Sequence, residues 1–268
     1  AWALGEAGEV PITNYLELAA AIGSDSHPFI VIQLARTLVS IDRLLDGSGV
    51  QAEWRAYARQ RLRPTFERIG WLPVEGEVEA VGLLRETLIR ALGRLDDSDV
   101  VAEARARFAR GAKVPEALPA AIHRPVQDTV GLHADRATWN EIRARAEAAS
   151  GPIERQRLLL ALGAARDPAL AARTLELALT QEVPATFAAN LIAAVASEHP
   201  ELAFEFAVAH ADAVLERVDA SSRWAFIPML PASSADAAMI EQVQAYVERS
   251  VPPDARQAAA VATADSRF

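Results

Sequence analysis

Apolar residues in this chain follow the spacing of a helix over long stretches. In residues 83–95 the apolar side chains recur at steps of three and four, which places them on one face of a helix. The same steps recur in residues 158–162 and 170–179. The one β-branched run, residues 29–34, continues into a helical stripe, and alanine, the strongest helix former, is abundant. The sequence therefore predicts an all-α protein.

Prolines and aspartates mark where several of these helices begin. Asp167-Pro168 has the pattern of a capping carboxylate followed by proline at the first helical position, where no backbone N–H is needed. Three more prolines are expected just inside helix starts: Pro152, Pro184 and Pro200. Asp96 and Asp97 are expected to cap another helix by accepting hydrogen bonds from free backbone N–H groups.

These boundaries give about fifteen helices of roughly 10 to 20 residues joined by short loops, which makes neighbouring helices antiparallel. Many short helices in series indicate a HEAT/armadillo-like superhelix of antiparallel helix pairs, here without a sharp sequence repeat. We expect residues 1–268 to form a single α-solenoid domain, with residues 111–119 the best candidate for an internal joint. A globular helical bundle is the alternative.

Composition excludes several classes of function. The chain has 27 basic and 36 acidic side chains, a net charge of −9, and an acidic domain repels nucleic-acid phosphates. No run approaches the ~18 apolar residues of a membrane-spanning helix, so we expect no membrane span. The lack of cysteine excludes disulfides, thiolate zinc ligands and a cysteine nucleophile. The sequence begins at Ala1 without a signal-peptide pattern, so we expect a piece of a longer protein, and the compartment is left open.

The sequence carries no recognisable catalytic motif. The histidines are scattered, and none forms H-E-x-x-H, the helical pattern that places two imidazoles and a glutamate base at one zinc ion. Glycine-rich phosphate loops and the nucleophile-elbow pattern G-x-S-x-G are missing as well. We therefore assign no catalytic, cofactor-binding or metal-binding residue and no cofactor to this chain.

Three groups of side chains have a structural explanation instead. Asp96, Asp97 and Asp99 resemble a magnesium-binding cluster, but helix capping explains them better. Five arginines within residues 55–68 resemble a basic patch, but acidic residues flank them, and we expect a solvated helix face. The large aromatic side chains are expected in or near the core: Trp54, Tyr57, Trp71, Trp139 and Trp224.

Several stretches, taken in order, resemble one family. Residues 66–71 (FERIGW), 75–77 (EGE) and 83–85 (LLR) are similar to the run l-G-W-x-x-x-E-x-E…L-R in the C-terminal helical domain of gluzincin zinc aminopeptidases, which include the puromycin-sensitive and endoplasmic-reticulum aminopeptidases. In the family this run is followed by a Gly/Asp turn and a helix with the pattern v…A…F. Asp96, Val100, Ala104 and Phe108 are similar to that turn and helix. Further similar positions are residues 2–8 (WALGEAG), Tyr15-Leu16, Glu154-Arg155, Leu159, Leu162, Asp167-Pro168, Leu175 and residues 200–206 (PELAFEF).

The resemblance implies a non-catalytic C-terminal domain of a zinc-dependent aminopeptidase. In that family the domain closes over the peptidase domain and forms a chamber that limits substrate access, so the implied partners are the upstream peptidase domain and peptide substrates. The family's H-E-x-x-H and G-x-M-E-N motifs are missing here, so zinc is expected in the upstream domain of the parent. The chain also ends at Phe268, short of the family's last helix.

Two alternatives stay open beside this interpretation. Arg223-Trp224 could contact a peptide carboxylate in the chamber, although an interhelical salt bridge is the preferred explanation. The alternative function for the whole chain is a free-standing α-solenoid scaffold that binds a protein partner.

Overall fold

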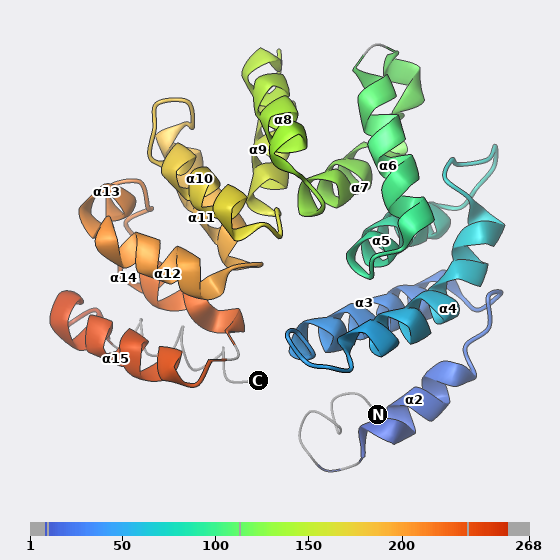
Figure 1. The fold of residues 1–268 in the computed structure, drawn as a ribbon, viewed down its shortest axis with the longest axis horizontal. Coiled ribbons are helices and arrows are strands. Elements are labelled where there is room, and N and C mark those ends of the chain that lie inside the picture. Colours follow the sequence, from blue (N-terminus) through green and yellow to red (C-terminus); the bar gives the residue numbers. More distant parts are fainter. Residues whose placement is uncertain (1–8, 10, 113, 235, 257–268) are drawn as a thin grey trace. The chain divides into compact units, whose positions relative to one another are not determined.

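The structure, a computed structural model, describes residues 9, 11–112, 114–234 and 236–256. Within these residues it contains fourteen α-helices and two short 3-10 helices, and no strand (Figure 1). The predicted all-α fold is confirmed. The chain divides into two compact units, residues 1–130 and 131–268, at a point inside helix α7 (Ala120–Leu132).

The first unit is built around helix α5. Its complete helices are α2 (Ile12–Ala20), α3 (Pro28–Leu44), α4 (Gln51–Ile69), α5 (Glu79–Arg94), α6 (Ser98–Gly111) and the 3-10 helix η1 (Pro115–Ala117). α5 packs against α3, α4 and α6. It can do so because Leu84, Leu88 and Leu92 recur at four-residue steps, and all three are fully buried.

The second unit is a series of short helices packed on their neighbours in the chain. They are α8 (Arg136–Ala148), α9 (Pro152–Gly163), α10 (Pro168–Ala178), α11 (Ala185–Ala196), α12 (Pro200–Ala209), α13 (Ala211–Leu215), α14 (Arg223–Met229), η2 (Leu230–Ser233) and α15 (Ala238–Ser250). α11 packs on α9, α10 and α12, so it occupies the middle of this unit. Its buried residues Leu191, Ile192 and Val195 supply apolar contacts in more than one direction.

Most of the predicted helix starts are confirmed. Pro152, Pro168 and Pro200 are each the first residue of their helix. The carboxylate of Asp167 accepts a hydrogen bond from the Ala169 backbone N–H at 2.8 Å. Pro184 departs from the prediction by one residue, because α11 begins at Ala185 and Pro184 is the residue that precedes it.

A degenerate repeat that the apolar pattern does not predict lies at three helix connections. The sequence Gly-x-x-x-Asp occurs at Gly93–Asp97, Gly131–Asp135 and Gly163–Asp167. Each aspartate is the cap of the helix that follows, and each glycine lies in the last turns of the helix before it. The connections between helix pairs therefore follow one local pattern in both units.

The three glycines also share a packing role. A Cβ on Gly93 would lie 2.7 Å from the Thr129 side chain, and one on Gly163 would lie 2.8 Å from the Ala194 Cβ. At Gly131 the nearest atom is the backbone oxygen of Ala161, at 2.1 Å from the added Cβ. Any side chain at these three positions would clash with its neighbour, so the close packing requires glycine. The superhelical arrangement of the helix pairs stays a prediction.

Two predictions about domains stay predictions as well. The boundary of the compact units falls between residues 130 and 131 rather than within residues 111–119. The N-terminal match to the family at residues 2–8, and Phe268 at the other end, lie outside the described residues.

Candidate functional site: the arginines of α4 and the α4–α5 loop

Helix α4 carries five arginines that hold the first unit together. Arg55, Arg59 and Arg63 are spaced four residues apart, which places them on one face of the helix. All three reach the connection between α5 and α6, residues 95–97. The row therefore links α4 to the end of one helix and the start of the next.

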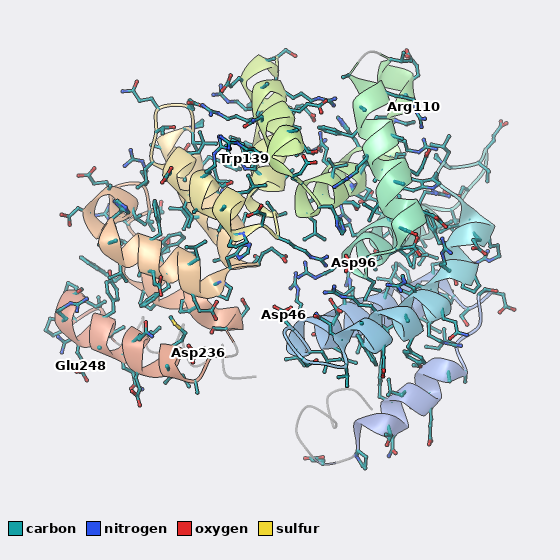
Figure 2. All side chains as sticks on the ribbon, in the orientation of Figure 1. Asp46, Asp96, Arg110, Trp139, Asp236 and Glu248 are labelled. Atoms are coloured by element: carbon teal, nitrogen blue, oxygen red, sulfur yellow. The ribbon has the colours of Figure 1, made fainter. Side chains whose placement is uncertain are left out.

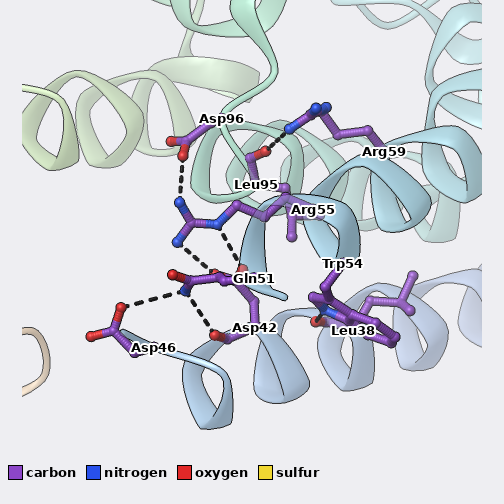
Figure 3. Close-up of polar contacts among 9 residues, drawn as sticks. All are labelled: Leu38, Asp42, Asp46, Gln51, Trp54, Arg55, Arg59, Leu95 and Asp96. Carbon is purple, nitrogen blue, oxygen red and sulfur yellow. Dashed lines mark hydrogen bonds and ion pairs between the residues drawn. The ribbon is translucent and has the colours of Figure 1, made fainter. Parts of the chain in front are cut away.

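Arg55 lies at the centre of this network (Figure 3). Its guanidinium contacts both carboxylate oxygens of Asp42 on α3, at 2.7 and 3.1 Å, and an oxygen of Asp96 at 2.5 Å. Burial alone would lower the pKa of Arg55, but the hydrogen bonds and charges of Asp42 and Asp96 outweigh it and raise the pKa. Asp42 is 1% exposed, so this is a buried ion pair that needs its partner. The Arg55 guanidinium therefore joins α4 to α3 and to the α5–α6 connection.

Arg59 and Arg63 complete the row. Arg59 donates to the Leu95 backbone oxygen at 2.5 Å, at the C-terminal end of α5, where a cation is favourable. Arg63 pairs with Asp97, which is buried, and with Asp99, which is exposed. Hydrogen bonding to Asp99 is the largest of the effects that raise the pKa of Arg63.

The two remaining arginines of α4 contact the end of α2 and the segment after it. Arg61 donates to the backbone oxygens of Ala19, Ala20 and Ile22 at 2.8 to 3.1 Å, and so caps the C-terminal end of α2. Arg68 donates twice to the Ser24 backbone oxygen, at 2.7 and 3.1 Å. The expectation of a solvated helix face is therefore wrong for Arg55, Arg59, Arg61 and Arg63, which are partly buried and bind acceptors from other elements, whereas Arg68 is exposed.

The acidic residues near position 97 divide between two roles. Asp97 accepts from the Val100 backbone N–H at 3.1 Å, so the predicted capping is confirmed for this residue. The N-cap residue of α6 is Asp97 rather than Asp96: the φ of 59° at Asp96 lies in the left-handed region, just after α5, and its carboxylate accepts from Arg55. No magnesium site is needed to explain the cluster.

The α4–α5 loop, residues 70–78, contains the glycine, tryptophan and glutamates of the family resemblance. The Arg85 guanidinium, 1% exposed, donates to the Ile69 and Gly70 backbone oxygens at 3.2 and 2.9 Å. It also pairs with both carboxylate oxygens of Glu77, one of them at 2.7 Å. Hydrogen bonding to Arg85 lowers the pKa of Glu77. The loop is thereby fixed at both ends by one buried side chain.

Trp71 anchors the same loop on its other side. Its ring meets that of Phe66 edge-on, with centroids 5.4 Å apart. The Arg107 guanidinium on α6 lies 5.1 Å from the Trp71 ring centroid, a cation–π distance. The residues 66–85 that carry the family resemblance therefore form one structural cluster that joins α4, α5 and α6.

In the second unit the corresponding anchor is Trp139 on α8 (Figure 2). It is 1% exposed, and its indole N–H donates to the Thr174 hydroxyl on α10 at 3.0 Å. The Arg173 guanidinium lies 4.4 Å from the ring centroid, and Arg143 lies 6.0 Å from it. The prediction that the large aromatic residues lie in or near the core is confirmed, since Trp54, Tyr57, Trp71 and Trp224 are partly buried.

The five histidines are spread over different elements of the chain. They sit before α3, on α7, in the α7–α8 connection, before α12 and after α12: His27, His123, His133, His199 and His210. His199 shares a hydrogen bond of 2.9 Å with the Ala165 backbone oxygen. Across the described part of the chain, no three histidine, aspartate or glutamate side chains are grouped so that they could hold a metal ion.

Arg223 and Trp224 open helix α14, and both are partly buried. Arg223 lies near Asp219 in the preceding connection, and its charge contributes to the lowered pKa of that carboxylate, after the hydrogen bonds from Ser221. Asp219 belongs to the residues just before α14, so this interaction is local. The predicted interhelical salt bridge and the peptide contact both stay predictions.

Comparison with known families decides what this arrangement belongs to. The model of the ERAP1-like C-terminal domain matches residues 1–267. This chain belongs to that family. The predicted resemblance to the C-terminal domain of aminopeptidases is thereby confirmed over almost the whole sequence. None of the helices that the structure describes is both long enough and apolar enough to cross a bilayer.

Proposed function

We propose that this ERAP1-like C-terminal domain is the non-catalytic part of a zinc-dependent aminopeptidase and closes the chamber in which that enzyme holds its peptide substrates. The observation that carries the proposal is the family match over residues 1–267. The sequence contains neither H-E-x-x-H nor G-x-M-E-N, so the zinc ligands and the amine-binding residues would belong to the upstream peptidase domain. That domain and the peptide substrate are the proposed partners.

The side-chain network of the first unit supports a structural role. A chamber wall has to keep its shape while peptides of different lengths enter and leave. The guanidiniums of Arg55 and Arg85 each join two or more elements through buried or partly buried contacts. Such contacts resist local unfolding better than exposed loops do.

The proposal predicts different substrate ranges for the parent enzyme with and without this domain. We would compare the zinc-loaded parent with a version that lacks residues 1–268, using an aminoacyl-anilide and peptides of increasing length. Closure of a chamber predicts that anilide hydrolysis persists while the dependence on peptide length is lost. An unchanged length dependence would overturn the chamber role.

Two further measurements keep the test independent of how well the shortened enzyme folds. The chain alone is expected not to hydrolyse aminoacyl-anilides, with or without added zinc, and zinc-dependent turnover would disprove the non-catalytic role. The gene of the parent is expected to encode H-E-x-x-H and G-x-M-E-N upstream of Ala1. A native start codon immediately before Ala1 would instead favour the free-standing scaffold.

A further inference from the structure

The α4–α5 loop carries an exposed apolar surface. Leu72, Val74 and Val78 are 44%, 68% and 64% exposed, and we call these three residues the loop patch. The loop connects the C-terminal end of α4 to the N-terminal end of α5 at the edge of the first unit (Figure 1). Apolar side chains gathered in one exposed segment often mark a binding surface.

The loop patch sits on a backbone that is already ordered. Gly70 and Gly76 take positive φ angles of 65° and 78°, which fixes two sharp changes of direction. The Glu77 backbone N–H donates to the Val74 oxygen at 3.1 Å, which closes a turn between two members of the loop patch. With Arg85 holding Gly70 and Glu77, the apolar side chains are presented without much freedom to fold inward. Binding to a preorganised surface loses less conformational entropy.

The charges around the loop patch favour one kind of partner. Glu75 and Glu79 are exposed, whereas the charge of Glu77 is matched by Arg85. Glu67 and Arg68, at the end of α4, carry opposite charges and offset each other. The rim of the loop patch is therefore acidic. A second copy of this chain, docked through the same surface, would place the acidic rims against each other.

We propose that the loop patch is a docking surface for a protein segment that combines aliphatic side chains with arginine or lysine. The aliphatic groups would cover Leu72, Val74 and Val78, and the basic groups would pair with Glu75 and Glu79. This proposal goes beyond the assignment to an aminopeptidase and does not depend on it, since it rests on the exposure, order and charge of one loop.

The test uses the full 268-residue chain and two fluorescein-labelled peptides of about 14 residues. Both peptides carry leucine at the same positions, and one has arginine and the other glutamate between them. Fluorescence anisotropy is expected to show that the arginine peptide binds at least about tenfold more tightly than the glutamate peptide, a difference of about 1.4 kcal/mol. Equal affinities, or no binding of the arginine peptide, would overturn the proposal.

Variants separate the loop patch from the general acidity of the chain. Val74→Ser with Val78→Ser is expected to weaken binding of the arginine peptide at least about tenfold. Glu75→Lys with Glu79→Gln is expected to reduce the preference for arginine over glutamate. The matched control is Ile153→Ser on α9, because Ile153 is 65% exposed and far from this loop in the sequence. Binding that is unaffected by the loop variants, or equally affected by the control, would show that the peptide is held elsewhere.

Discussion

Gly131 in α7 lies directly against Ala161 in α9: a Cβ on residue 131 would be 2.1 Å from the Ala161 backbone oxygen. That distance is far below any van der Waals contact, and the obstructing atom belongs to a backbone that cannot rotate away. The close approach places two helices in contact where the Gly-x-x-x-Asp repeat turns from one helix to the next.

We expect Gly131→Ala to destabilise the protein by about 2 kcal/mol or more, because the helix α7 backbone has to move to admit a methyl group. The matched control is Gly82→Ala in α5, where an added Cβ meets nothing within 4 Å. At such an open helical position alanine is expected to stabilise by about 0.5 to 1 kcal/mol. Urea unfolding monitored by circular dichroism measures both changes. A change in the free energy of unfolding with the same sign for both substitutions would contradict the close packing at residue 131.

We expect Arg85→Met to destabilise by about 3 to 5 kcal/mol, because it leaves Glu77 and two backbone oxygens without their buried partner. Arg90→Met is the control, since Arg90 pairs with Glu86 and Asp128 but is 33% exposed, and its loss is expected to cost no more than about 1 kcal/mol. Both variants would be measured by urea unfolding at pH 7. Equal losses of stability in the two variants would mean that burial does not strengthen the Arg85–Glu77 ion pair.

The pH dependence of Glu77 provides a separate test. Its pKa in the folded protein is lowered by Arg85, so its contribution is fully present above the unfolded pKa of about 4.3 and is lost as the pH falls through the folded value. Glu77→Gln is therefore expected to be less stable than the wild type at pH 7, and the gap should narrow below about pH 4. Urea midpoints between pH 7 and pH 3 measure this gap. A gap that is constant over this range would contradict a charged Glu77–Arg85 pair.

The two carboxylates that share Arg55 are expected to differ in importance. Asp42→Asn should cost about 3 kcal/mol, because Asp42 is 1% exposed and its loss leaves Arg55 partly buried beside a neutral group. Asp96→Asn should cost no more than about 1 kcal/mol, since Asp96 is 39% exposed and asparagine tolerates its left-handed backbone. Thermal melts and urea unfolding of the two variants measure the difference. A larger loss of stability for Asp96→Asn than for Asp42→Asn would contradict the conclusion that the Asp42 contact is the more important one.

The amino-acid sequence was enough to predict an all-α fold and most of the helix starts that it marked. A helix start depends on residues within one turn: Pro152, Pro168 and Pro200 begin their helices, and Asp97 and Asp167 cap theirs, because all the groups involved lie within three residues of each other. The order of motifs in residues 66–85 also predicted the family, which the match over residues 1–267 confirmed.

A signal for the arginines was present in the sequence but could not be interpreted alone. The steps of four from Arg55 to Arg63 place three guanidiniums on one face of α4, and the acidic residues at 96–99 are their natural partners. The sequence of residues 51–69 does not predict that this helix face contacts residues 95–99, because the partners are 34 to 41 positions apart in the chain. A helix face with unknown neighbours is expected to be solvated.

Which helix surfaces pack together became clear from the three-dimensional structure. In the structure the arginines of α4 contact α2, α3 and the α5–α6 connection, where the sequence alone predicted a solvated helix face. The structure also showed why residue 131 has to be glycine, since the constraint comes from the backbone of Ala161 on another helix. Local propensity is set by neighbours in the chain, whereas close approach and buried ion pairs are set by neighbours in space, and those are known only once the helices have packed.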